Sequence, residues 1–171
     1  MTPPTSPSPR EADARAIEAL LGRPSFTDHT VAVRCPHGGP AVLENAPVDR
    51  NGRPFPTRYW LACRALVDAV SRLESGGAVR ELLADPGMTP HIREANLRHA
   101  ALHDGAHVSG TADPDRLKCL HAHAAFGLAT GGGPVLDWIA ARTDISWPER
   151  CCLERFPDGS GAAGGEGDAG E

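Results

Sequence analysis

The spacing of apolar residues along this chain changes at Arg64, and the change predicts the fold class. Before it, residues 30–34, 41–44 and 57–62 form short runs typical of β-strands, with turn-forming residues between them. The strongest turn signal is Asn51-Gly52, because both residues tolerate the positive φ angles of a tight hairpin. After Arg64 the apolar residues recur every three or four positions, as in helices. The sequence therefore predicts an α+β fold, with a small antiparallel sheet in the N-terminal half and helices packed on it.

Six helical segments are predicted around this sheet. One precedes the strands and ends at Gly22, and the others follow Arg64. An aspartate followed by a proline, at positions 113 and 114, is typical of an N-cap and a first helical residue, so a long helix is expected directly after it. The predicted helices are residues 10–21, 64–75, 79–84, 90–103, 115–130 and 134–142.

The two ends of the chain have compositions that do not support folding. Residues 1–9 are almost all proline, serine and threonine, and residues 157–171 are mostly glycine, alanine and acidic residues. Neither stretch can bury enough apolar surface to offset the entropy lost on ordering it. We therefore expect disordered tails at 1–9 and 157–171, on either side of a single α+β domain at 10–156.

The net charge of −5 belongs mostly to the C-terminal tail, where four acidic residues follow Phe156 without a basic partner. The predicted domain is then nearly neutral, which argues against a broad nucleic-acid surface or an anionic-membrane surface. No apolar run approaches the ~20 residues that cross a bilayer, and the N-terminus lacks the features of a secretory signal. We expect a cytoplasmic protein without membrane contact, and a protein partner stays open.

Two short segments concentrate thiols and imidazoles, the side chains that bind soft metals or act as nucleophile and base. Residues 35–40 read Cys-Pro-His-Gly-Gly-Pro, where proline and two glycines bend the backbone sharply. Residues 118–123 read Lys-Cys-Leu-His-Ala-His and contain the only lysine of the chain. On the predicted helix 115–130, the cysteine and the second histidine of this segment are four residues apart and share one face.

A cysteine and a histidine from each segment make a complete Cys₂His₂ set, which holds zinc with tetrahedral geometry. We therefore predict that the chain binds one transition metal ion, with zinc favoured, and has an accessory or regulatory role. The alternative is inert burial, in which the cysteines act as small hydrophobes and the histidines as polar residues at a helix edge. The predicted metal ligands are Cys35, His37, Cys119 and His123, with Cys63 as a spare candidate.

Two other functions stay open for the same residues. The first is a small enzyme in which Cys119 or His121 is reactive, while Lys118 and Arg58 hold a phosphate or carboxylate group of the substrate. Arg58 also belongs to a set of arginines that flank the aromatic strand 57–62, and their aliphatic stems can cover its rings. The second is a non-catalytic interaction module whose cysteines are structural.

The remaining cysteines and histidines are interpreted as structural or solvent-exposed. Cys151 and Cys152 precede the C-terminal tail, so we expect two semi-exposed thiols there. The histidines at 99, 103 and 107 recur every four residues, but a glycine before the last of them and the polarity of the segment favour a solvated helix face. Five cysteines without the spacing of a disulfide framework argue for thiols rather than cystines.

Several motifs, in the same order, resemble those of a known bacterial family. They read Cys-Pro-His-Gly-Gly-Pro-Ala-Val at 35–42, Pro-Phe-Pro-Thr-Arg-Tyr-Trp-Leu at 54–61, Val-Ser-Arg-Leu-Glu-Ser-Gly-Gly at 70–77 and Lys-Cys-Leu-His-Ala-His at 118–123. The chain resembles the family of small bacterial proteins catalogued as domain of unknown function number 501, which carries no established activity. The resemblance implies a shared site at Cys35, His37, Arg58, Lys118, Cys119, His121 and His123.

Overall fold

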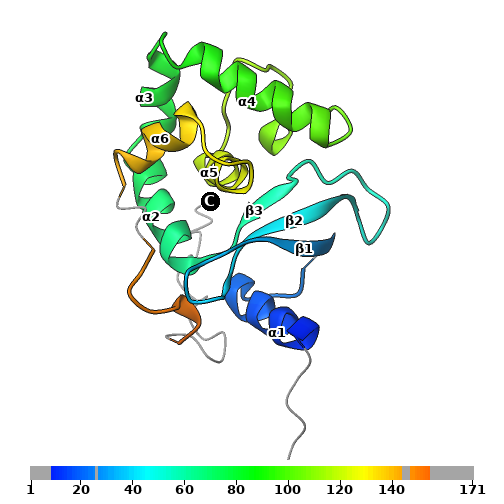
Figure 1. Cartoon of the computed structure of the whole chain (residues 1–171). Coiled ribbons are helices and arrows are strands. Elements are labelled where there is room, and N and C mark those ends of the chain that lie inside the picture. The colour runs from blue at the N-terminus through cyan, green and yellow to red at the C-terminus, as the bar shows by residue number, and fades with distance from the viewer. Residues whose placement is uncertain (1–8, 26, 144–146, 155–171) are drawn as a thin grey trace, which may run out of the picture.

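The fold is given by a computed structural model, which describes residues 9–25, 27–143 and 147–154 (Figure 1). The predicted tails at 1–9 and 157–171 lie almost wholly outside the described residues. The helices and strands are α1 (Pro9–Leu21), β1 (Thr27–Arg34), β2 (Pro40–Asp49), β3 (Tyr59–Leu61), α2 (Arg64–Ser75), α3 (Ala78–Ala84), α4 (Thr89–Leu102), α5 (Leu120–Ala129) and α6 (Pro134–Ala140), with 3-10 turns η1 (Val108–Gly110) and η2 (Cys152–Glu154).

The three strands form one antiparallel sheet in the order β1-β2-β3, which confirms the predicted α+β class. In the central strand, Leu43 lies opposite Val31 of β1 and Trp60 of β3. Both faces of this strand are buried, because the consecutive residues Ala41, Val42 and Leu43 are at most 1% exposed. The helix α5 covers one face of the sheet and α1 the other (Figure 1).

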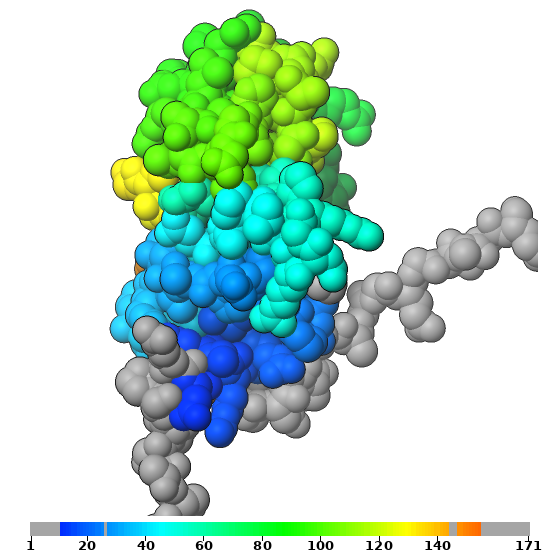
Figure 2. All heavy atoms as spheres, turned by 90° about the vertical axis from the view of Figure 1, so that its right-hand side faces the viewer, coloured from blue at the N-terminus to red at the C-terminus, as the bar shows by residue number. Residues whose placement is uncertain are grey.

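The predicted turn at Asn51-Gly52 is also confirmed. Gly52 has a φ angle of +75°, and its N–H donates to the carbonyl of Asp49 at 2.9 Å. The carboxylate of Asp49 accepts hydrogen bonds from the N–H groups of Asn51 and Arg53. The turn region lies on the face seen in Figure 2, between α4 above and α1 below.

The helix α5 lies at the centre of the helical layer, between the sheet and the other helices (Figure 1). Most of its residues are buried, and several of these are alanine or glycine. Small residues let neighbouring helices approach closely: a Cβ atom at Gly127 would lie 2.7 Å from the Cβ atom of Leu136 in α6. Because of this central position, some side chains of the segment 118–123 are buried in the core, whereas others lie at the partly exposed boundary with α2.

The helix predicted from residue 115 begins at Leu120 instead, so its predicted start was wrong. Asp113 forms a local turn, in which its carboxylate accepts the N–H of Asp115 at 2.9 Å. The side-chain amide of Asn96 then donates to the carbonyls of Pro114 and Arg116, at 2.7 and 3.0 Å. A helix starting at 115 would need such carbonyls for its own N–H groups, so a tertiary contact with α4 replaces its first turn.

None of the helices in the described part of the chain is both long and apolar enough to cross a membrane.

Candidate metal centre

Three donor side chains from two elements meet where α5 begins. Glu74 lies in the last turn of α2, Cys119 precedes α5, and His121 lies in its first turn. The Nδ1 atom of His121 is 3.2 Å from Oε2 of Glu74 and 3.8 Å from Sγ of Cys119. The ligand atoms of all three lie within 4.8 Å of one another, and no other group of three such side chains comes as close among the described residues.

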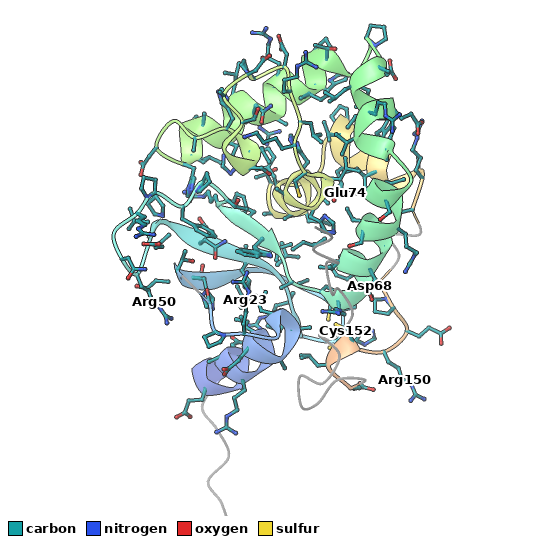
Figure 3. All side chains as sticks on the ribbon, turned by 180° about the vertical axis from the view of Figure 1, so that it is seen from behind. Arg23, Arg50, Asp68, Glu74, Arg150 and Cys152 are labelled. Carbon is teal, nitrogen blue, oxygen red and sulfur yellow. The ribbon has the colours of Figure 1, made fainter. Side chains whose placement is uncertain are left out.

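The position of Glu74 follows from how α5 starts. The first N–H groups of a helix have no partner within the helix, and Oε1 of Glu74 accepts the N–H of Leu120. Cys119, the residue before it, has extended backbone angles of −147° and 120°. A carboxylate from α2 thus binds the N-terminus of α5, where negative charge is favoured, and the same bond holds this carboxylate beside His121. Figure 3 shows Glu74 next to α5.

The second ring nitrogen of His121 is held by α2. Its Nε2 atom lies 3.2 Å from the carbonyl oxygen of Val67 and 3.0 Å from Oγ of Ser71. Both ring nitrogens thus face acceptors, and the Ser71 hydroxyl can also donate to Nε2. In the tautomer with the proton on Nε2, the ring donates to the carbonyl of Val67, and the lone pair of Nδ1 faces the Glu74 carboxylate and the Cys119 thiol.

The geometry of the group favours chelation over a nucleophile–histidine–carboxylate relay. Burial raises the pKa of the Cys119 thiol, and the charge of Glu74 raises it further, although a bond from the amide of Ala122 opposes them. In a nucleophile–histidine–carboxylate relay, the two ring nitrogens face different partners. Here Nδ1 of His121 faces both the thiol and the carboxylate, so the three groups converge on one point.

The structure does not bring the four sequence-predicted ligands together. His37 is exposed, and its Nε2 atom is 2.7 Å from the carbonyl of Pro148. Cys35 is buried at the end of β1, beside Cys151. Of the predicted set only Cys119 belongs to the three-residue group.

His123 lies in the core of the protein. It is 2% exposed, and neither ring nitrogen has a hydrogen-bond partner among the described residues. Burial lowers the pKa of His123 to about 3, with a smaller contribution from His99. Because α5 begins at Leu120, Cys119 lies outside the helix, and the four-residue spacing does not place the two side chains on a common face.

The predicted anion-binding residues occupy separate environments. Arg58 pairs with Glu44 and donates to the carbonyl of Leu102, and its guanidinium lies 5.6 Å from the ring centre of Tyr59, as expected for an arginine that covers the aromatic strand. The ammonium group of Lys118 donates to the carbonyl of Gly110 at 3.2 Å. His121, which the alternative hypothesis treats as reactive, lies with Glu74 and Cys119.

Two further expectations are corrected by burial. The histidines at 99 and 103 are 1% and 2% exposed rather than solvated, and burial lowers the pKa of His99 to about 4. The thiols of Cys151 and Cys152 are buried as well, at 8% and 7% exposure. The ring nitrogens of His99, His103 and His107 lie within 3.0 Å of the carbonyl oxygens of Ala106, Phe55 and Thr111, respectively.

Glu74 is the residue that the sequence reasoning missed. One signal was present: Val67, Ser71 and Glu74 are spaced by four and three residues, so they share one face of α2. The carbonyl of Val67 and the hydroxyl of Ser71 lie beside Nε2 of His121, and the carboxylate of Glu74 lies beside Nδ1. Glu74 also lies in the motif at 70–77, where its role as a ligand was not considered.

The fold and the site define a small α+β protein with a Glu-Cys-His group at a helix junction. Over residues 31–101 the chain matches the family described as "Protein of unknown function (DUF501)", which confirms the resemblance inferred from its motifs. The matched part contains Glu74 and the face of α2 that holds His121, and it ends before Cys119. Neither the curated proteins nor the solved structures include a significant match.

Proposed function

We propose that this protein binds one transition metal ion, with zinc favoured, through Glu74, Cys119 and His121. The observation that carries the proposal is the orientation of His121. Its Nε2 atom lies 3.2 Å from the carbonyl oxygen of Val67, and its Nδ1 atom faces a carboxylate and a thiol. A histidine that binds a metal typically donates its other N–H to a carbonyl or carboxylate in this way.

The distances within the group suit a single zinc ion. Tetrahedral zinc with the usual bond lengths places a sulfur and a nitrogen ligand about 3.6 Å apart, and a nitrogen and an oxygen ligand about 3.3 Å apart. The corresponding separations here are 3.8 Å between Sγ of Cys119 and Nδ1 of His121, and 3.2 Å between this Nδ1 and Oε2 of Glu74. A metal ion therefore fits with only small side-chain shifts.

The donor set favours zinc over the hard cations. Magnesium and calcium prefer oxygen ligands, whereas a thiolate and an imidazole select zinc and related metals. Glu74 lies in the last turn of α2, where the negative end of the helix dipole attracts a cation, whereas the N-terminus of α5 at the same place opposes it.

Three protein ligands leave a fourth position for water or another molecule. The side chains of Glu74 and His121 are 27% and 24% exposed, so solvent reaches the group. The proposed centre is thus of the open kind, and an accessory or regulatory role would act through whatever occupies the fourth position.

Zinc titration of chelator-treated, fully reduced protein against a chromophoric competitor tests the proposal. We expect one tightly bound equivalent, lost in Cys119→Ser and His121→Ala and weakened in Glu74→Gln, which keeps an oxygen to accept the N–H of Leu120. The cobalt(II) form should show the charge-transfer band of a single thiolate ligand.

The sequence-predicted ligands provide the matched controls. His37→Ala and Cys35→Ser remove an imidazole and a thiol outside the group, and each should keep the full zinc equivalent. Stoichiometric binding that survives His121→Ala, or that disappears in His37→Ala, would overturn the assignment. A wild-type protein that binds no zinc at micromolar concentration would leave Glu74 and His121 as an ordinary ion pair and overturn the function itself.

A further inference from the structure

Four of the five cysteines lie together at one edge of the sheet, away from the proposed metal centre. Cys35 follows β1 and Cys63 follows β3; both strands run antiparallel to β2, so their C-terminal ends lie at the same edge. Cys151 and Cys152, in the segment 147–154, pack against these two ends. All four thiols are buried, at 8% exposure or less.

The four sulfur atoms form two pairs. Sγ of Cys152 is 3.9 Å from Sγ of Cys63. The thiols of Cys151 and Cys35 both border Gly39, where a Cβ atom would lie 2.8 and 3.4 Å from their sulfur atoms. No three of the four ligand atoms lie within 4.8 Å of one another among the described residues, so the arrangement differs from a compact four-thiolate metal site.

The two members of the first pair differ in their environments. Cys63 is the N-cap of α2. The sulfur of Cys152 lies in hydrogen-bond contact with the Cys63 thiol, and it accepts hydrogen bonds from the amides of Arg64 and Ala65 at the start of that helix. These contacts lower the pKa of Cys152, while the contact with Cys152 and burial raise the pKa of Cys63. A helix N-terminus next to a thiol donor is an environment that stabilises a thiolate.

Cys152 also borders space that small molecules can enter. It is one of the residues that line a pocket of about 570 Å³ between the start of α2 and the segment 147–154, together with Arg64, Asp68 and Arg150. Asp68, Arg150 and Cys152 are labelled in Figure 3. In contrast, burial and the neighbouring Cys35 raise the pKa of the Cys151 thiol. These environments favour Cys152 as the reactive member of the cluster, with the Cys63 sulfur 3.9 Å away.

We propose that Cys152 and Cys63 form a reversible dithiol–disulfide pair that exchanges with a low-molecular-weight disulfide, and that oxidation ties the segment 147–154 to the start of α2. The Cys152 thiolate attacks one sulfur of the small disulfide, forms a mixed disulfide and releases one thiolate. Cys63 then loses its proton and attacks the Cys152 sulfur, which forms the internal disulfide and releases the second thiolate. Two protein thiols are oxidised, and one small disulfide is reduced to two thiols.

The test is oxidation of the reduced, metal-free full chain by glutathione disulfide at neutral pH, followed by alkylation and mass spectrometry. We expect the number of free thiols to fall from five to three. Trypsin should then release the peptide 59–64 disulfide-linked to the peptide 151–155. In Cys63→Ser the reaction should stop at one glutathione adduct on Cys152, and in Cys152→Ser the linked peptide should be absent.

Cys151→Ser is the matched control, since it removes the adjacent thiol and should leave the formation and position of the disulfide unchanged. A disulfide that maps to Cys35 or Cys119, or thiol loss that occurs only in denaturant, would contradict the proposal. Zinc binding abolished by Cys63→Ser or Cys152→Ser would also contradict it, because these thiols would then be metal ligands.

The outcome is separable from that of the proposed function. Cys119→Ser should form the Cys63–Cys152 disulfide at the wild-type rate, and Cys152→Ser should bind one equivalent of zinc. Either proposal can therefore fail while the other stands.

Discussion

Replacement of His123 by leucine should remove part of the acid sensitivity of this protein. His123 is 2% exposed and unpartnered among the described residues, and burial lowers its pKa from 6.5 to about 3. The unfolded chain therefore takes up a proton at a pH at which the folded chain cannot. The stability associated with this group is fully present above about pH 6.5 and declines as the pH falls from there towards about 3.

The magnitude follows from the two pKa values. Protonation of His123 stabilises the unfolded state by about 2 kcal/mol more at about pH 5 than at about pH 8. Values of 3 or 4 for the folded pKa give nearly the same result at this pH, so His99, with a pKa lowered to about 4, contributes a similar amount. Wild-type protein should lose about 4 kcal/mol through the two histidines, and His123→Leu about half of that.

Urea denaturation followed by circular dichroism at the two pH values measures this difference. With a typical denaturant dependence, 2 kcal/mol corresponds to a change of about 1 M in midpoint. His37→Gln, which alters an exposed imidazole, controls for the loss of one histidine. If His123→Leu keeps the full pH dependence of the wild type, or if the His123 ring titrates near neutral pH by NMR, the placement of this residue in the core is refuted.

Three further outcomes test the metal centre and the packing around it. Ser71→Ala should weaken zinc binding by about 10- to 100-fold, as expected for loss of an outer partner of a ligand, and an unchanged affinity in competition titrations would show that Ser71 does not help to hold Nε2. Zinc affinity should fall about tenfold per pH unit below neutrality, because Cys119 must lose its proton before it binds the metal. Zinc titrations at about pH 7.5 and about pH 6.5 measure this change. An affinity that does not depend on pH would exclude a thiolate ligand. Gly127→Ala should destabilise the fold by about 1–3 kcal/mol in urea denaturation, since its Cβ would lie 2.7 Å from that of Leu136, and a gain from helix propensity alone would show that α5 and α6 lie farther apart.

The sheet and most helices could be predicted because their signals are local. The turn at Asn51-Gly52 depends on the backbone freedom of its own residues, and the start of α2 depends on an apolar period within the same segment. The start of α5 depends on Asn96 instead, whose amide captures the carbonyls of Pro114 and Arg116. A proline after an aspartate predicts a helix start only where no distant side chain competes for those carbonyls.

The full set of residues in the proposed metal centre could not be predicted from local sequence signals either. Spacing along one helix can pair Cys119 with His123, but it cannot show that the helix starts one residue after the cysteine. His123 then turns into the core, while His121 turns towards α2. Glu74 becomes a partner only because α2 and α5 pack side by side, and this contact depends on the tertiary fold.

One centre was expected from two thiol-rich segments, whereas the structure has the proposed thiol pair and the proposed metal centre at opposite ends of α2. Cys63 caps the N-terminus of this helix, and Glu74 lies in its last turn, so the two sites are about 16 Å apart along the helix axis. The positive end of the helix dipole favours the Cys152 thiolate, and the negative end favours a cation beside Glu74. The same helix thus supports opposite charges at its two ends. Because groups separated by more than about 10 Å act nearly independently, the proposed thiol pair and the proposed metal centre are expected to function independently of each other.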